Sequence, residues 1–187
     1  VSFLIFIMQL TVKADDIRDF EIEGISIGDS LLNHISKTQI DKLSKQFVYP
    51  NKQYYIFVIE KDYLNLNTYD YIQVEIKNND FNYTVEALSG FLDYKNQIKD
   101  CHKKTKKIDS DIKESFKDLT IDKYNKKHRS DKTKKSINYI TEFIFKNGDT
   151  IVTICEDWSS HMNHADSLRV GIVPKKFYDW ISNEAYN

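Results

Sequence analysis

The stretch INYITEFIFKNGDTIVTIC, residues 137–155, decides the fold. It holds two apolar runs, 137–145 and 150–155, on either side of the tetrapeptide KNGD. An Asn-Gly pair between such runs is the strongest short-range signal for a hairpin, because both residues tolerate the positive φ of a tight turn. The stretch therefore predicts two antiparallel strands joined by a short turn.

Four further runs extend this pattern into a sheet. Residues 54–59 are apolar on both faces, as in a central strand, and residues 72–76 alternate between apolar and polar side chains. Residues 83–94 form a third run, in which Gly90 is interpreted as a bulge, and residues 168–172 form the last. We expect an antiparallel sheet of about five to six strands in two meanders.

A long amphipathic helix is predicted between the two groups of strands. Apolar side chains recur there at intervals of three and four residues: Ile98, Cys101, Thr105, Ile108, Ile112, Phe116 and Leu119. Short helices are predicted near both ends, capped by Asp29 and Thr38 or begun by Pro174. The fold class is therefore α+β, with the long helix packed on the sheet. Residues 15–187 are expected to form a single domain, with a mobile basic loop around 120–136.

The first residues resemble a signal peptide. FLIFIM at 3–8 is an apolar run, and Val12 and Ala14 provide slim side chains three and one before a cut after Ala14. Residues 1–14 are thus predicted to be cleaved, although the basic segment that normally opens such peptides is missing. The run is shorter than the ~20 residues of a membrane span. We therefore expect a periplasmic or secreted protein that does not span the membrane. The alternative interpretation of the apolar run is a short buried strand at the start of the domain.

The two cysteines, Cys101 and Cys155, are predicted to form a disulfide. In an oxidising compartment, two cysteines on facing elements of one core are most simply explained by a bridge. The alternative is a reactive Cys155 thiol activated by His161.

Gly28-Asp29-Ser30-Leu31 resembles the nucleophile block of the GDSL esterase and lipase family. The resemblance implies ester hydrolysis by Ser30, with Asp157 as the orienting acid and His161 as the base. The late segment has one residue more than the Asp-x-x-His spacing of that family, and strand meanders differ from its parallel sheet. We therefore keep the esterase as an alternative and assign no catalytic residue.

A second alternative is a metal site in the loop that follows residue 157. His161, His164 and Asp166 could bind zinc or copper if the backbone brings the two imidazoles together. The spacing lacks the glutamate of a His-Glu-x-x-His metalloprotease helix. The leading hypothesis includes neither a metal nor another cofactor.

Positive charge is concentrated in residues 95–135. This region holds 15 Lys and Arg against 7 Asp and Glu, on a chain whose net charge is −1. A region with this excess of positive charge is expected to bind an anionic envelope surface or an acidic protein. Nucleic acid is not expected, because the chain is predicted to be exported, has a pI near 6.6 and contains only three arginines.

Three stretches carry a family resemblance: FEIEGISIGDSLLNHIS at 20–36, ALSGFLDYKNQIKDC at 87–101, and NGDTIVTICEDWS at 147–159 with PKKFYDWI at 174–181. Together they resemble small exported proteins of AT-rich marine bacteria, which implies export but no particular activity. The segment 24–26 is also similar to the small outer-membrane assembly lipoprotein fold, without the lipid-bearing cysteine. The leading hypothesis is a non-enzymatic periplasmic or secreted binding or accessory domain.

Overall fold

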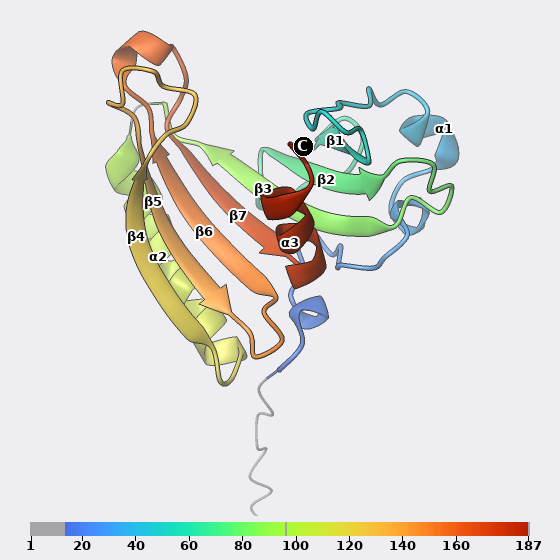
Figure 1. Cartoon of the computed structure of the whole chain (residues 1–187), viewed down its shortest axis with the longest axis horizontal. Helices are drawn as coiled ribbons and strands as arrows, with labels where there is room; N and C mark the ends of the chain where they lie inside the picture. Colours follow the sequence, from blue (N-terminus) through green and yellow to red (C-terminus); the bar gives the residue numbers. More distant parts are fainter. Residues whose placement is uncertain (1–13, 96, 187) are drawn as a thin grey trace, which may run out of the picture.

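The protein is built on one antiparallel sheet of seven strands (Figure 1). The computed structural model describes residues 14–95 and 97–186. The spatial order is β1-β2-β3-β7-β6-β5-β4, so β1 and β4 form the two edges, and the expectation that residues 54–59 form a central strand is wrong. The strands are β1 (Tyr54–Glu60), β2 (Tyr71–Lys77), β3 (Val85–Asp93), β4 (Thr120–Lys127), β5 (Ile137–Ile144), β6 (Thr150–Asp157) and β7 (Ser167–Val173).

Strand β4 corrects the prediction of a mobile basic loop around 120–136. Residues 120–127 pair with β5 along their whole length, from Thr120 opposite Ile144 to Lys127 opposite Ile137. Every side chain of β4 is exposed, so no apolar alternation marks the strand in the sequence. It forms because its backbone completes the hydrogen bonding of β5. The sheet therefore has more strands than the predicted five to six.

Two helices cover opposite faces of the sheet (Figure 1). The long helix α2 (Ile98–Ser115) lies on one face, and α3 (Lys175–Asn183) lies on the other. The short helices are η1 (Ile17–Asp19), η2 (Leu31–Asn33), α1 (Lys37–Ile40) and η3 (Ser160–Met162). Ser30 caps η2 and Ser36 caps α1, in place of the predicted Asp29 and Thr38. No helix among the described residues is long and apolar enough to cross a membrane.

The strand alternation divides the interior into two apolar clusters. On the α2 side, residues such as Ile72, Val74 and Ile76 join the main core, which also contains residues of the N-terminal segment such as Ile25 and Leu31. On the α3 side, a smaller cluster contains Tyr49, Tyr54, Ala87, Phe177, Trp180 and Ala185. A shift of one residue in register would exchange these faces, so burial fixes the pairing.

Gly90 is not at a bulge. It lies in register between Ile72 of β2 and Val170 of β7, and the irregularity of β3 lies instead opposite Glu75 and Ile76. A Cβ atom at Gly90 would come within 2.7 Å of the Tyr69 ring. The glycine is therefore explained by the close approach of an aromatic ring to the strand.

Residues 1–13, which hold most of the predicted signal peptide and the alternative buried strand, lie outside the described residues. Ala14 forms a short parallel bridge beside the end of α2. Its N–H donates to the Ser115 carbonyl at 3.0 Å, and its carbonyl accepts from the Lys117 N–H at 3.2 Å. A cut after Ala14 would remove this bridge from the mature protein.

Candidate binding groove

An open groove of about 470 Å³ lies between α2 and the edge of the sheet at β4. We call it the basic groove. Its lining comes from α2, β4, β5 and β6: His102, Thr105, Lys106, Asp109, Lys123, Tyr124, Asn125, Tyr139, Ile140, Thr141 and Cys155. Seven of these eleven residues belong to the region 95–135, where the sequence concentrates positive charge.

A buried carboxylate forms the floor of the basic groove. Asp109 is only 4% exposed, although it lies on a helix dominated by lysine. It accepts hydrogen bonds from the Thr153 and Thr141 hydroxyls at 2.8 and 3.1 Å, and from the Lys123 ammonium at 2.8 Å. Because a buried charge is tolerated only when it is paired and hydrogen-bonded, this network fixes α2 to three strands.

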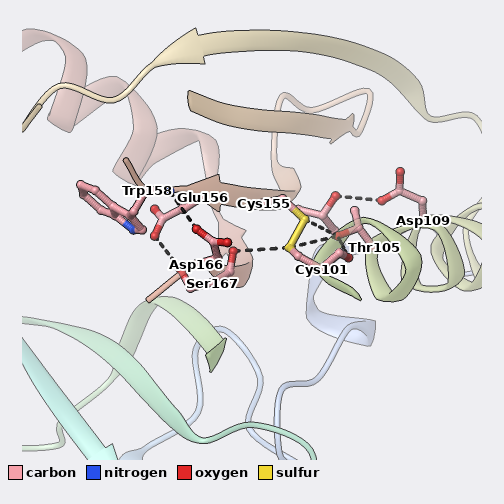
Figure 2. Close-up of a disulfide and its surroundings, with 9 residues drawn as sticks. Cys101, Thr105, Asp109, Cys155, Glu156, Trp158, Asp166 and Ser167 are labelled. Atoms are coloured by element: carbon pink, nitrogen blue, oxygen red, sulfur yellow. Dashed lines mark hydrogen bonds between the residues drawn. A yellow bond between two sulfur atoms is a disulfide. The ribbon is translucent and has the colours of Figure 1, made fainter. Parts of the chain in front are cut away.

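The disulfide lies beside this network (Figure 2). Cys101 of α2 and Cys155 of β6 are bonded, with their Cα atoms 5.9 Å apart. The Thr105 hydroxyl donates to the Cys101 carbonyl at 2.9 Å, and its oxygen lies 3.0 Å from Cys155 Sγ. The bond leaves no thiol at Cys155 for the alternative catalytic role. Covalent and polar links thus hold α2 at a fixed distance from the sheet.

A lysine side chain lines each wall of the groove. Lys106 comes from α2 and Lys123 from β4, and His102 packs edge-on against Tyr139 at a centroid distance of 4.7 Å. Asp109 forms an ion pair with Lys123 at 2.8 Å, so the positive charge of the lining comes mainly from Lys106. Lys127 follows on the same side of β4 as Lys123, because strand side chains alternate. The groove can therefore attract an anionic group and offer it hydrogen-bond donors.

The residues of the esterase alternative do not come together. The Ser30 hydroxyl donates to the Asn82 carbonyl at 2.6 Å and accepts from the Leu32 N–H, which makes Ser30 a cap of η2. His161 belongs to η3, which lies beyond the opposite end of the sheet from η2 (Figure 1). The pKa of Asp157 is raised by its burial and by the nearby Asp166, and no hydrogen bond joins it to His161 within the described residues.

His161 is bound instead to Asp131, a residue for which the sequence predicted no role. His161 Nε2 lies 3.2 Å from Asp131 Oδ1, and Nδ1 lies 3.0 Å from the Ser159 hydroxyl. The Ser159 hydroxyl also lies within hydrogen-bond distance of Asp131 Oδ2, at 3.1 Å. The cluster is a clasp between the β4–β5 and β6–β7 loops.

Asp131 is the centre of this clasp. Its side chain accepts from the backbone N–H groups of Thr133, Lys135 and Ser136, and from the hydroxyls of Thr133 and Ser136. Burial raises the pKa of Asp131, but the hydrogen bonds from Thr133 and Ser136 together outweigh it and hold the pKa below its usual value. The spacing Asp-x-Thr, typical of an Asx turn, was the available signal in the sequence.

The residues of the metal alternative do not come together either. His161 faces the clasp, His164 packs edge-on against Trp158, and Asp166 accepts from the Trp158 N–H at 3.0 Å. No group of three or more His, Cys, Asp or Glu side chains in residues 14–95 and 97–186 is arranged to hold a metal ion.

A second buried carboxylate lies on the α3 side of the sheet. Glu75 of β2 is 5% exposed, and its Oε2 has no hydrogen-bond partner among the described residues. Burial raises the pKa of Glu75 to about 7, although the positive charge of Arg169 opposes the shift. Arg169 donates to the Ser89 hydroxyl instead, at 3.1 Å. This carboxyl is covered by protein and does not line the basic groove.

Comparison with known proteins gives no family. No protein-family model and no curated protein matches the chain. Among solved structures, the chain is weakly similar to a point mutant of protein Mog1, at 11% identity and a TM-score of 0.31; the alignment covers 78% of this chain and 85% of that one. The Saccharomyces cerevisiae Ran-binding protein Mog1p gives 11% identity and a TM-score of 0.32, with 78% and 86% covered. Neither overlap supports a conclusion about this chain.

Proposed function

We propose that the protein is a non-enzymatic binding or accessory domain of the periplasm or the extracellular space, and that the basic groove holds an anionic partner. The observation that carries the proposal is the groove itself, with Lys106 on its α2 wall, Lys123 paired to Asp109 on its β4 wall, and exposed lysines continuing along α2 and β4. Fields of one sign in a recess attract ligands of the opposite sign and speed their association.

Two features support export. The apolar run at 3–8 and the small residues before position 15 suit a cleaved leader. The Cys101–Cys155 disulfide is compatible with an oxidising compartment, where such bonds persist. Fractionation of cells that express the whole chain, followed by intact-mass measurement, tests this part. We expect a mature protein that begins at Asp15 in the exported fraction; a retained leader in the cytoplasm would contradict it.

Binding is tested with two anionic probes, poly-L-glutamate and vesicles of anionic phospholipid. The variant Lys106→Glu/Lys127→Glu reverses one charge in the groove and one beside it on β4, and it leaves the Lys123–Asp109 pair intact. The matched control, Lys42→Glu/Lys52→Glu, makes the same change in net charge at exposed lysines near β1. We expect the groove variant to weaken binding about tenfold or more and the control to change it far less. Equal effects of both variants would mean that net charge alone, and not the groove, attracts the probe.

A further inference from the structure

The outer edge of β4 presents unpaired backbone groups beside the basic groove. The N–H of His128 donates to the carbonyl of Ser136 at 2.9 Å, in register with the β4–β5 ladder. In an antiparallel pair, hydrogen-bonded residues alternate with residues whose N–H and C=O groups point away from the partner strand. The even-numbered residues of β4 therefore bond to β5. The odd-numbered residues, Ile121, Lys123, Asn125 and Lys127, direct their backbone groups outward.

The two edges of the sheet differ in this respect. At β1, Ile56 exchanges both backbone hydrogen bonds with Gln46, at 2.9 and 3.0 Å, so a neighbouring segment covers part of that edge. At β4, no described segment forms such a bridge. Strand β4 is also as long as β5 and β6, whereas edge strands that avoid pairing are usually short. The β4 edge is thus the part of the sheet where a strand can be added.

We propose that an extended, acidic segment of a partner protein pairs with the outer edge of β4 and places alternate carboxylates over the basic groove. The proposal rests on the proposed function and names its partner class. Main-chain hydrogen bonds supply the affinity in such strand addition, and side chains at every second position supply the specificity. In β4, the residues with outward backbone groups are also those whose side chains point to the groove side.

The charge of β4 selects an acidic partner. The strand carries Lys123, Lys126 and Lys127 against the single acid Asp122, and the facing wall of α2 adds Lys106. Lysine on an edge strand discourages pairing with a like-charged edge, which disfavours a second copy of this chain. The carboxylates of an acidic strand are instead attracted to the lysines of β4. A lipid surface would use the lysines but leave the outward N–H groups unused.

The experiment uses an acetylated peptide of alternating Glu and Val with the length of β4, and the same peptide N-methylated at its Glu residues. When the carboxylates lie over the groove, the N–H groups of the Glu residues are the ones that face β4. Both peptides carry the same charge, but the methylated peptide lacks the N–H donors that pair with β4. We expect the plain peptide to bind at least about fivefold more tightly than the methylated peptide. Equal binding of the two peptides would overturn strand addition and leave an anionic surface interaction intact.

Two variants test the same point from the protein side. Asn125→Pro removes an outward N–H without touching the bonds to β5, a position at which a sheet tolerates proline. Asn125→Ala keeps that N–H and serves as the control. We expect the proline variant alone to weaken peptide binding about fivefold, with both variants folded as judged by circular dichroism.

The anionic probes separate failure of this inference from failure of the proposed function. If vesicles bind and the peptide does not, the partner class is wrong. If no anionic probe binds, the proposed function is wrong as well. Dimers that form through β4 would also overturn the acidic partner.

Discussion

Glu75 makes the stability of the protein depend on pH, and Glu75→Gln should remove that dependence. The carboxyl is buried on the α3 side of β2, one oxygen has no hydrogen-bond partner among the described residues, and its pKa rises from 4.5 to about 7. The fold therefore prefers the protonated form. The unfolding free energy therefore has its full value below pH 4.5, where Glu75 is protonated in both states, and it falls as the pH rises through about 7.

The magnitude follows from the shift. Each pKa unit corresponds to about 1.4 kcal/mol, so ionising Glu75 in the folded state costs roughly 3 kcal/mol of unfolding free energy. Glutamine has nearly the same shape and cannot ionise. We therefore expect Glu75→Gln to gain stability relative to the wild type as the pH rises, and to reach a difference of roughly 3 kcal/mol above pH 7.

Urea unfolding at a series of pH values measures this difference directly. Other groups titrate in both proteins alike, so only the difference between wild type and variant matters. Glu60→Gln, at an exposed position of β1, is the matched control and should show no such trend. Parallel curves of wild type and Glu75→Gln would refute the reasoning, because they would mean that the carboxyl is solvated or fully paired in the folded protein.

Three further changes probe the architecture around the groove. Replacing Cys101 and Cys155 by serine should lower the unfolding free energy by about 4 kcal/mol for a sequence separation of 54, and an unchanged urea midpoint would show that the bridge is absent. Gly90→Ala should cost about 1–3 kcal/mol through contact with the neighbouring tyrosine ring, whereas a stabilised variant would contradict the close approach. Asp109→Ala should lower the unfolding free energy by about 3 kcal/mol, because two hydroxyls and an ammonium lose their acceptor. The control Asp111→Ala removes an exposed carboxylate and should lower it by under about 1 kcal/mol. Equal losses in the two variants would disprove a special role for the network.

The elements with one buried face were predictable from the sequence. The hairpin of β5 and β6 turns at Asn147-Gly148, where Gly148 has the positive φ of 88° that the turn requires. Ile72, Val74 and Ile76 point into the core, as their alternation indicates. The cysteine pairing was predicted because both cysteines were placed on facing elements of the core of a protein expected to be exported. For the hairpin and the strands, the decisive signals are local: a turn dipeptide, and the periodicity that burial imposes on the residues concerned.

Features that depend on contacts between distant segments were not predictable. Strand β4 has no buried side chain, so only its pairing with β5 defines it, and lysine-rich composition alone suggests a loop. The partner of His161 is Asp131, which is 30 residues away and meets it only because two loops converge. The buried state of Asp109 depends in the same way on threonines from two strands, which no helical pattern reveals.

Amide hydrogen exchange of β4 tests the docking edge most directly. In the free protein, the N–H groups of Ile121, Lys123, Asn125 and Lys127 should exchange fast, and those of the even-numbered residues between them should be protected by β5. Saturation with the alternating Glu and Val peptide should protect the four outward amides and leave the others unchanged. Binding of the peptide without any new protection of these four amides would contradict strand addition at β4.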